Sequence, residues 1–424
     1  MQNLHNINFG DKKIIKKKKC VLCFSDKINT VLDFKKTPLA NSYKKDLNDQ
    51  EDYFKLSCVL CANCGHLQLS HLTNPKIIFE DYLYISGTSK VLKKHFIDYA
   101  KKIISKFKLN TQSRVLDIAC NDGTFLEYFI KKKFKYVVGV EPAKNLRKLN
   151  LKKEIDINTS FFSSSYSAKM KRKYNTFDII TANNVFAHSP NLYDFSQGVK
   201  NLLSFKGVFV FEVSYLLTVI KKKTFDTMYH EHMSYHSLKP LINFFNKQNL
   251  QIFDFELIEA QGGSIRIYVS HRNAYKISKI KIEKQIKKEK LEGLYSKRRF
   301  QKFFKEINET KNKLKALLNE LRNKNYNIIG YGAPAKLTTL THVFNLNKND
   351  FNIVIDDNNL KVNKYTPGKK FLIKDFKYLV NNKNNYQVII VLAWNFFKSI
   401  KIKCKQVNKN FLFISPFPRP RIDK

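Results

Sequence analysis

The sequence predicts an α/β protein, in which a cysteine-rich amino-terminal module precedes a parallel sheet flanked by helices and a second, smaller α/β unit closes the chain. Three observations predict this architecture. Two CxxC pairs lie within the first 64 residues, strand-like and helix-like segments alternate between residues 114 and 212, and the same alternation returns after residue 327. Alternating strands and helices are typical of parallel sheets, whose ligand sites lie at the carboxyl ends of the strands.

Length and charge limit the possible classes of protein. A chain of 424 residues is long enough for two or three domains. Its formal charge of +42 would suit a nucleic-acid or anionic-membrane partner, yet Gly (13) and Pro (10) are scarce while Phe (35) and Tyr (21) are plentiful. This composition is expected where A/T-rich codons dominate a genome. We therefore explain the positive charge by codon usage, together with a modest need to hold anionic substrates.

The amino-terminal residues carry charge but no apolar core of an export signal. No run of about eighteen apolar residues follows anywhere in the chain. We therefore expect a cytoplasmic protein without a membrane span.

The two CxxC pairs predict a structural zinc site, because each pair can direct two thiolates at one ion. Gly65 follows the second pair and gives its turn a permissive backbone. Cys58 could form an alternative CxxC with Cys61, but we expect it to be a bystander, and His66 and His71 to be ordinary packing or surface residues. The four predicted ligands are Cys20, Cys23, Cys61 and Cys64.

A strand, turn, helix, strand and terminal acid follow one another from residue 114. An apolar run at residues 114–119 ends at the turn Cys120-Asn-Asp-Gly123, a helix is expected from Thr124, and residues 136–140 form a second strand closed by Glu141. This order is the layout that holds a nucleoside, although Gly123 is the one glycine of the usual motif that is present. Further strands are expected at residues 177–181 and 207–212.

Two short polar strings follow the last two of these strands. Residues 182–188 read ANNVFAH, and residues 229–232 read YHEH. An amphipathic helix or a buried strand would place apolar residues there, whereas amides, imidazoles, a phenol and a carboxylate are crowded together. Such a combination is typical of proton-transfer sites.

The remaining segments complete a predicted division into four. Residues 275–323 are rich in Lys and Glu, with apolar residues at helical spacing, and predict a helical connector with a solvated face. After it we expect strands at residues 327–330, 351–355, 388–393 and 411–414, with a turn GYGAPAK and a helix from Leu337. The predicted domains are residues 1–75, 76–274, 275–323 and 324–424.

Taken together, these motifs resemble the S-adenosylmethionine-dependent nucleotide-sugar C-methyltransferases, which add branch methyl groups to deoxysugars. The resemblance covers nearly the whole chain: the double CxxC with LQL after it, the NDG turn, ANNVFAH with Asp194 beyond it, YHEH, GGSIR at 262–266 and GYGAPAK at 330–336. Cys120 stands where the family often shows Ser, and Gln261 where members commonly carry His. The second departure could signal a different sugar.

The resemblance implies a class I methyltransferase Rossmann-like sheet, an amino-terminal zinc-binding module and a second, carboxyl-terminal Rossmann-like domain for the nucleotide sugar. It implies S-adenosylmethionine and structural Zn²⁺ as cofactors. Glu141 would accept hydrogen bonds from the ribose hydroxyls. The residues expected to bind the cofactor are Asp117, Ala119, Asn121, Gly123, Glu141, Asn183 and Asn184.

Carbon methylation needs a carbanion, and an imidazole can remove the acidic hydrogen next to a sugar carbonyl. We expect His232 to be this base, with Glu231 orienting the ring or the substrate. Tyr229 and His188 would donate to the enolate oxygen, and the resemblance adds Tyr82 or Tyr84 to the pocket. The sugar nucleotide would be held by Arg266, Lys336 and Tyr331, the first two gripping its diphosphate.

We therefore predict C-methylation of a nucleotide-linked keto-deoxysugar, at carbon 3 of a 4-keto sugar. The main alternative is an RNA methyltransferase that grips its substrate with the zinc module and the basic surface, but no RNA-binding motif is present and the GYGAPAK segment would have no purpose. A zinc-dependent interaction protein would leave YHEH unexplained. We expect no nucleic-acid partner, and the oligomeric state stays open, with a monomer compatible with the sequence.

Overall fold

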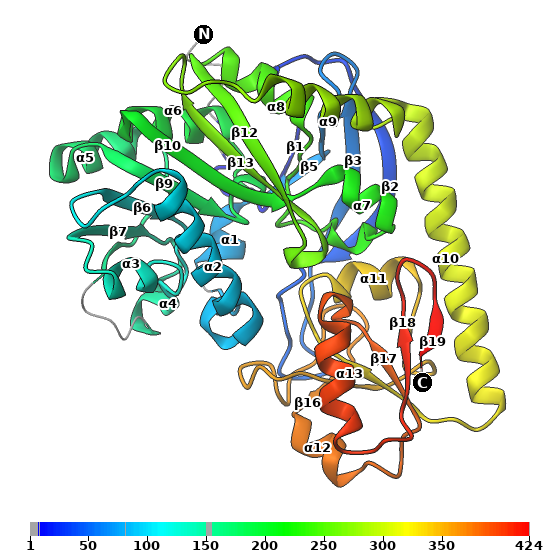
Figure 1. Ribbon diagram of the computed structural model, residues 1–424. Helices are drawn as coiled ribbons and strands as arrows, with labels where there is room; N and C mark the ends of the chain where they lie inside the picture. Colours follow the sequence, from blue (N-terminus) through cyan, green and yellow to red (C-terminus); the bar gives the residue numbers. More distant parts are fainter. Residues whose placement is uncertain (1–6, 8, 81, 150–154, 424) are drawn as a thin grey trace. The chain divides into compact units, whose positions relative to one another are not determined.

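The computed structural model describes residues 7, 9–80, 82–149 and 155–423 (Figure 1). The chain divides into two compact units, each built from three separate stretches. Unit 1 comprises Met1–Asn29, Val59–Leu217 and Met233–Tyr295, and unit 2 comprises Thr30–Cys58, Thr218–His232 and Ser296–Lys424. The YHEH string thus belongs to the same unit as the GYGAPAK turn.

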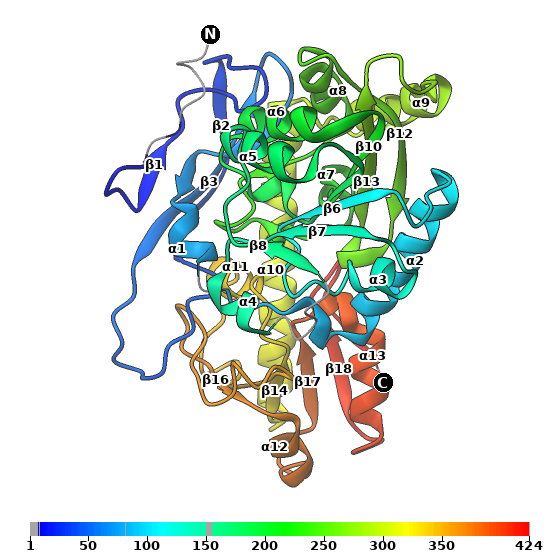
Figure 2. The ribbon, with the colours of Figure 1, turned by 90° about the vertical axis from the view of Figure 1, so that its left-hand side faces the viewer.

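Unit 1 contains a seven-stranded sheet in the order β12-β13-β10-β9-β6-β7-β8, in which β6 and β7 are neighbours (Figure 2). Strands β6 to β10 are parallel, and β12 and β13 add an antiparallel edge. The chain order reverses between β6 and β9, which makes their carboxyl ends the switch point where ligands bind. The strands are β6 (Arg114–Ile118), β7 (Tyr136–Val140), β8 (Asp156–Asn158), β9 (Phe177–Asn183), β10 (Leu203–Ser214), β12 (Leu250–Ile258) and β13 (Ser264–His271).

Short and medium helices connect the strands of this unit. Helix α2 begins after Ser89, whose side chain accepts the Leu92 amide as an N-cap. The helices are α1 (Pro75–Phe79), α2 (Lys90–Lys106), α3 (Glu127–Lys131), α4 (Lys144–Leu149), α5 (Ser164–Tyr174), α6 (Leu192–Leu202), α8 (Leu238–Asn246) and α9 (Lys279–Leu291), while α7 (Leu216–Lys222) crosses the division between the units. The helix expected from Thr124 begins three residues later, at Glu127.

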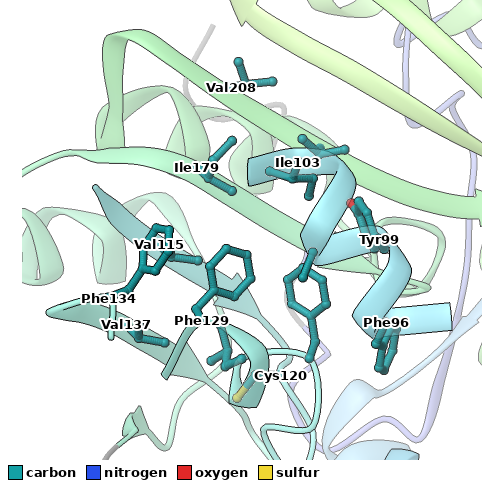
Figure 3. Close-up of a cluster of buried hydrophobic side chains, with 14 of the residues drawn as sticks. Phe96, Tyr99, Ile103, Val115, Cys120, Phe129, Phe134, Val137, Ile179 and Val208 are labelled. Atoms are coloured by element: carbon teal, nitrogen blue, oxygen red, sulfur yellow. The ribbon is translucent and has the colours of Figure 1, made fainter. Parts of the chain in front are cut away.

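A cluster of buried side chains packs α2 against the sheet. The helix contributes residues three and four positions apart, such as Phe96, Tyr99 and Ile103, and the strands contribute Val115 and Ile179 (Figure 3). Burying each large apolar side chain stabilises the fold by about 1.5–3 kcal/mol. This core lies directly before the turn at Cys120, which also belongs to the cluster, and so fixes where that turn begins.

Two small sheets form the amino-terminal part. Strand β1 (Ile14–Lys16) pairs with β5 (His71–Thr73). A four-stranded sheet has the order β11-β4-β3-β2, with β11 (Ser234–Tyr235), β4 (Leu67–Leu69), β3 (Tyr53–Cys61) and β2 (Ile28–Pro38). The two long strands β2 and β3 each begin in one unit and end in the other.

Unit 2 contains a six-stranded sheet in the order β16-β15-β14-β17-β18-β19. All strands except the antiparallel β19 are parallel, and the chain order reverses between β14 and β17. The GYGAPAK turn follows β14 and therefore lies at the switch point of this second sheet. The strands are β14 (Ile328–Tyr331), β15 (Ile353–Ile355), β16 (Leu372–Lys374), β17 (Val388–Val391), β18 (Leu412–Ser415) and β19 (Arg421–Asp423), and the helices are α11 (Leu337–Val343), α12 (Phe376–Asn381) and α13 (Phe397–Lys405).

The predicted helical connector consists of two helices. Helix α9 ends at Leu291, and α10 (Lys297–Asn323) begins in the other unit. Its residues Leu314, Leu318 and Leu321 are buried at helical spacing. In the part of the chain that the structure describes, neither α10 nor any other helix combines the length and apolar character needed to cross a membrane.

Candidate active site and metal centre

Four cysteine sulfurs meet in unit 1, at the loop after β1 and the end of β3. Their Sγ atoms all lie within 4.8 Å of one another, and among the described residues they form the one cluster of acidic, His or Cys side chains able to hold a metal ion. No disulfide joins them. The cluster consists of Cys20, Cys23, Cys61 and Cys64, which is the predicted set.

The spacing of these sulfurs fits zinc. A tetrahedral ion with Zn–S bonds of about 2.3 Å separates its sulfurs by roughly 3.8 Å. The Cys20–Cys64 and Cys23–Cys61 sulfur pairs are 3.6 and 3.5 Å apart. Gly65 adopts a φ of +82°, as the predicted tight turn requires.

The cysteine and histidines expected to be bystanders lie outside this cluster. The Cys58 thiol is buried and contacts the Met228 sulfur at 3.9 Å. The His66 Nε2 lies 3.3 Å from the Ser234 hydroxyl, and burial lowers the pKa of this imidazole to about 3. The His71 ring hydrogen-bonds to Ser70.

The turn after β6 coils back on itself because alternate residues take the left-handed conformation. Ala119, Asn121 and Gly123 have φ values of +53°, +56° and +79°. Asn and Gly adopt this region easily, whereas it costs Ala about 1 kcal/mol. The turn begins where the Cys120 amide donates to the Val140 carbonyl at 3.1 Å. All of these residues lie at the carboxyl end of β6, where a cofactor was predicted.

Glu141 joins the end of β7 to this turn. Its carboxylate is buried, with Oε2 accepting the Asn121 amide at 2.8 Å and Oε1 accepting the Ala143 amide at 2.9 Å. Burial raises the pKa of Glu141, and the two amide hydrogen bonds oppose that rise. Each carboxylate oxygen has a further lone pair, so both main-chain hydrogen bonds are compatible with the ribose contact, which stays a prediction.

Asp117 and Asn183 lie side by side at the switch point between β6 and β9. Asp117 is buried and accepts the Thr181 hydroxyl at 2.6 Å and the Asn183 amide at 3.4 Å. Burial raises the pKa of Asp117 to about 7. Asn183 Oδ1 is buried and has no hydrogen-bond partner among the described residues. A buried acceptor of this kind fits a ligand that brings hydrogen-bond donors, as the amino and hydroxyl groups of S-adenosylmethionine would.

The remaining predicted cofactor residue, Asn184, follows directly. It takes the left-handed conformation with a φ of +56°, and its amide donates to the Glu212 carbonyl at 2.9 Å. This bend ends β9 beside β10.

The segment that carries Tyr82 and Tyr84 is tied to the cofactor turn. Asn121 accepts the Ser86 amide and donates to the Tyr84 carbonyl, both at 2.9 Å. Asp122 accepts the Gly87 amide at 2.9 Å. The Tyr82 amide donates to the Asn145 side chain, and the Tyr82 carbonyl accepts from it. The main chain at Tyr84 is therefore joined to a predicted cofactor residue, while Tyr82 is held by α4 in the same unit.

His188 ends the short helix η3 (Phe186–His188) in the same unit. Its ring stacks on Phe79, with ring centroids 5.5 Å apart and an angle of 20° between the planes. The Met233 amide donates to the neighbouring Ala187 carbonyl at 2.9 Å.

Arg266, predicted to grip phosphate, lies in β13 with 3% of its surface exposed. Its Nε donates to Glu212 at 2.6 Å, and its guanidinium stacks 3.6 Å from the centroid of the Tyr99 ring. The His95 Nε2 donates to the other Glu212 oxygen at 2.8 Å. The Arg266 guanidinium also lies 3.5 Å from the Glu256 carboxylate. The described partners of Arg266 thus include two acids and an aromatic ring, and its phosphate role stays a prediction.

In unit 2, Tyr229 and His232 form a hydrogen-bonded pair. His232 Nδ1 lies 2.7 Å from the Thr227 carbonyl, which can only accept, so this nitrogen carries the hydrogen. Nε2 is then the basic nitrogen, and it accepts the Tyr229 hydroxyl at 3.0 Å. Burial lowers the pKa of His232 to about 4. The imidazole is therefore neutral, with its basic nitrogen held in one direction.

Glu231 accepts a hydrogen bond from Asn41, a residue 190 positions earlier in the chain. The nearby Tyr43 donates its hydroxyl to the Ala333 carbonyl in the GYGAPAK turn. In α11, Thr339 donates to the Met228 carbonyl at 3.0 Å. The loop after β2, the YHEH string and the GYGAPAK turn are thereby joined within unit 2.

Lys336 ends the GYGAPAK turn and directs its side chain toward Trp394, the one tryptophan of the chain. Its Nζ lies 3.5 Å from the ring centroid and donates to Asn395 at 2.7 Å. The indole N–H donates to the buried Asp226 at 2.7 Å. Tyr331 donates to Asp357 at 3.1 Å. The nucleotide-sugar roles of Lys336 and Tyr331 stay predictions.

Four residues of this unit that interact with the predicted site residues were not predicted from the sequence. Asn41, Asp226 and Asn395 belong to no motif, and nothing in their surroundings in the chain indicates a site. Trp394 carried a signal, since a single tryptophan after a buried strand is unusual enough to be singled out.

Three family models match the chain in succession. They describe a zinc binding domain over residues 20–79, a methyltransferase domain over residues 92–254 and a C-methyltransferase C-terminal domain over residues 259–418. Over 406 residues the chain is 26% identical to C-methyltransferase NovU of Streptomyces niveus, a match that covers 95% of this chain and 96% of that protein.

Solved structures resemble part of the chain. A SAM-dependent methyltransferase from Anabaena variabilis matches with a TM-score of 0.34 and 15% identity, covering 41% of this chain and 84% of its own. An S-adenosylmethionine-dependent methyltransferase from Clostridium acetobutylicum matches with a TM-score of 0.33 and 17% identity, covering 43% and 92%.

Proposed function

We propose that this chain, which belongs to the S-adenosylmethionine-dependent C-methyltransferases with an amino-terminal zinc-binding domain, methylates carbon 3 of a nucleotide-linked 4-keto-deoxysugar. The membership rests on the three successive family matches and on the similarity to NovU along nearly the whole chain. The substrate and the ring position are the proposed part, and they follow from the resemblance. One observation carries the proposed enolate chemistry: the neutral His232 imidazole, whose basic Nε2 is oriented by the Thr227 carbonyl.

His232 acts as the base in this proposal. Its Nε2 takes the hydrogen from the carbon next to the sugar carbonyl, and the bonding electrons move onto the carbonyl oxygen to give an enolate. Bound S-adenosylmethionine would supply the methyl group to that carbon. The proton then leaves the imidazolium for solvent, which the low pKa of His232 favours. Tyr229, already hydrogen-bonded to Nε2, is placed to donate to the enolate oxygen once Nε2 is protonated.

The cofactor is assigned to the residues around the switch point of unit 1. The buried, unpartnered Asn183 Oδ1 supports this assignment, and so does the acid at the end of β7. Asp117, Ala119, Asn121, Gly123 and Asn184 would surround it. In the same unit, His188, Tyr82 and Tyr84 are proposed to contact the sugar.

The proposal for the nucleotide sugar concerns unit 2 and β13. Lys336 and Tyr331 lie at the switch point of the second sheet, the position where parallel sheets bind ligands. Arg266 is the third proposed residue. Glu231, held by the Asn41 amide, would orient the sugar beside His232.

Hydrogen exchange in heavy water tests the proposal. The enzyme is incubated with S-adenosylhomocysteine and a panel of thymidine-, uridine-, guanosine- and cytidine-diphosphate-linked 4-keto-deoxysugars, and NMR follows the hydrogen at carbon 3. We expect exchange with at least one sugar in the wild type. His232→Asn should lose both exchange and methyl transfer by about 100-fold or more, with unchanged affinity for the cofactor.

His342→Asn serves as the matched control, because this histidine lies in α11 of the same unit and takes no part in the proposed chemistry. Methyl transfer in His232→Asn above about a tenth of the normal rate would remove His232 as the base. Transfer of labelled methyl groups to RNA, with none to the sugars, would support the alternative function instead.

A further inference from the structure

We infer that Lys336 is a catalytic residue of the proposed methylation, whose ammonium group stabilises the enolate oxygen, and that Asp226, Trp394 and Asn395 position it. This inference rests on the proposed function. It assigns Lys336 a task different from the predicted diphosphate contact, because the side chain contacts an indole and an amide of its own unit and has a buried carboxylate behind them.

The ammonium group of Lys336 has hydrogen-bonding capacity left over. It can donate three hydrogen bonds. Its surroundings in the described chain provide one acceptor, Asn395 Oδ1 at 2.7 Å, and the face of Trp394 at 3.5 Å. Lys336, Trp394 and Asn395 are all partly exposed. The ammonium group therefore has donors left for a ligand that brings an acceptor, and an enolate oxygen is the strongest acceptor that the reaction produces.

Asp226 is the counter-ion behind this cation. It is fully buried, and one of its oxygens accepts the Trp394 N–H at 2.7 Å. Lys336 and Asp226 interact through space. Trp394 thus connects the two charges, one face against the ammonium and one edge against the carboxylate.

The same backbone segment carries the base. Asp226 directly precedes Thr227, whose carbonyl holds His232. Thr339 of α11 donates to the Met228 carbonyl in this segment. Lys336 directly precedes α11, so a hydrogen bond joins the helix after the cation to the segment that holds the base. The charge of Lys336 also acts on the His232 imidazole and disfavours its protonated form.

The negative charge that develops on the enolate oxygen is stabilised by a nearby positive charge. A preorganised donor aimed at an oxyanion typically contributes 10²–10³-fold in rate. The titratable groups that interact with Lys336 are Asp226 and His232. Burial lowers the pKa of Lys336 to about 8, while the negative charge of Asp226 opposes this change. The cation should therefore be present below about pH 8 and be lost above it.

Trp394 gives a readout that needs neither substrate nor cofactor. Because it is the only tryptophan, the indole fluorescence of the whole chain reports on the ring that Lys336 covers. We expect the wild-type emission to change with a midpoint near pH 8. The change should be absent in Lys336→Met and should move to lower pH in Asp226→Asn. An identical titration in Lys336→Met overturns the contact between this cation and the indole, on which the inference rests.

Kinetics then separate an enolate role from a diphosphate role. With the keto-sugar panel used above, Lys336→Met should lower the rate of hydrogen exchange at saturating sugar by about 100-fold or more, with a smaller change in KM. Lys336→Arg, which keeps the charge, should recover part of the loss. A diphosphate grip would instead raise KM and leave the saturated rate near normal, which would contradict the inference.

Two controls complete the test. Lys383→Met removes an exposed lysine of the same unit and should change neither reading. Thermal melting identifies any variant that fails to fold, and Lys336→Arg then carries the comparison. A wild-type enzyme inactive on the whole panel overturns the proposed function, and the enolate role with it. An active wild type with an equally active Lys336→Met overturns the inference alone.

Discussion

At the scale of single residues, Glu141 has two connections that the motif does not reveal. Its carboxylate holds the Asn121 and Ala143 amides, so it shapes the turn after β6, in addition to its proposed contact with a ribose. A change at this position should therefore act on cofactor affinity through both routes.

We expect Glu141→Ala to weaken binding of S-adenosylmethionine by roughly 10- to 100-fold, since charge-assisted hydrogen bonds contribute about 1.5–3 kcal/mol. Isothermal titration calorimetry measures this directly. Glu283→Ala, which removes an exposed acid from α9 of the same unit, should leave the affinity unchanged. An unaltered dissociation constant in Glu141→Ala would place the ribose elsewhere.

The depressed pKa of His232 makes a prediction about pH. A group with a folded pKa of about 4 stays in its neutral, basic form as pH falls, until the pH approaches that value. Between pH 5.5 and 7 the rate of hydrogen exchange should change less than about twofold, whereas an ordinary imidazole with a pKa near 6.5 would lose about eightfold. Exchange rates in buffers of constant ionic strength decide between the two. A decline centred near pH 6.5 would mean that the base is a different or a more exposed group.

The sequence could predict the motif residues but not their partners. His232, Tyr229 and Lys336 stand in short strings whose chemistry is unusual for a core, so they could be singled out. Asn41 and Asp226 stand in segments whose composition is not unusual. Their roles depend on partners that are distant in the sequence, as in the hydrogen bond from Asn41 to Glu231. The tautomer of His232 also depends on a backbone carbonyl, which no residue pattern encodes.

At the scale of elements, a glycine in β7 makes room for a side chain from the turn after β6. A Cβ atom on Gly139 would lie 2.5 Å from the Cys120 sulfur and 3.1 Å from an Ile157 methylene carbon. The cysteine at the cofactor turn and the glycine of the neighbouring strand are thus matched in size.

We expect Gly139→Ala to lower the free energy of unfolding by about 1–3 kcal/mol, the usual cost of overpacking. Replacing Cys120 by Ala removes the nearest atom, so Gly139→Ala should cost less in that background. A double-mutant cycle from urea denaturation gives the coupling. Additive effects of the two changes would show that the sulfur does not determine the close approach.

The strands were predictable where the pattern was strong. Arg114–Ile118, Phe177–Asn183 and Ile328–Tyr331 are short apolar runs that end in turns, and the structure confirms them with shifts of a residue or two. The antiparallel edge of β12 and β13 was not predicted, because the direction of a strand depends on its partner and not on its own alternation. Similarly, the Lys- and Glu-rich connector gave no signal that residue 295 divides it between the two units.

At the scale of the whole molecule, the zinc site connects distant parts of the sequence. Its two cysteine pairs come from chain positions about forty residues apart, and β2 and most of β3 lie between them. A metal that joins such segments stabilises the fold in which they meet.

We expect the purified protein to contain one zinc ion per chain and Cys61→Ala to lose it, with a lower melting temperature. Elemental analysis and thermal melting provide the two measurements. Cys58→Ala is the matched control, because this thiol lies three residues away in the same strand but outside the cluster. Full zinc retention in Cys61→Ala would contradict the assignment of the four ligands.

The division into units has a consequence for the chain while it is being made. Unit 2 needs residues 30–58 together with residues 218–232 and 296–424. At the ribosome, residues 59–295 emerge between the first and the last of these stretches, which takes roughly 10–50 s at typical rates of synthesis. For that time the amino-terminal portion of β3 and most of β2 are outside the tunnel without residues 296–424 of their finished unit. The nascent protein should therefore depend on trigger-factor-type chaperones, and slowed translation before residue 296 should lower its soluble yield.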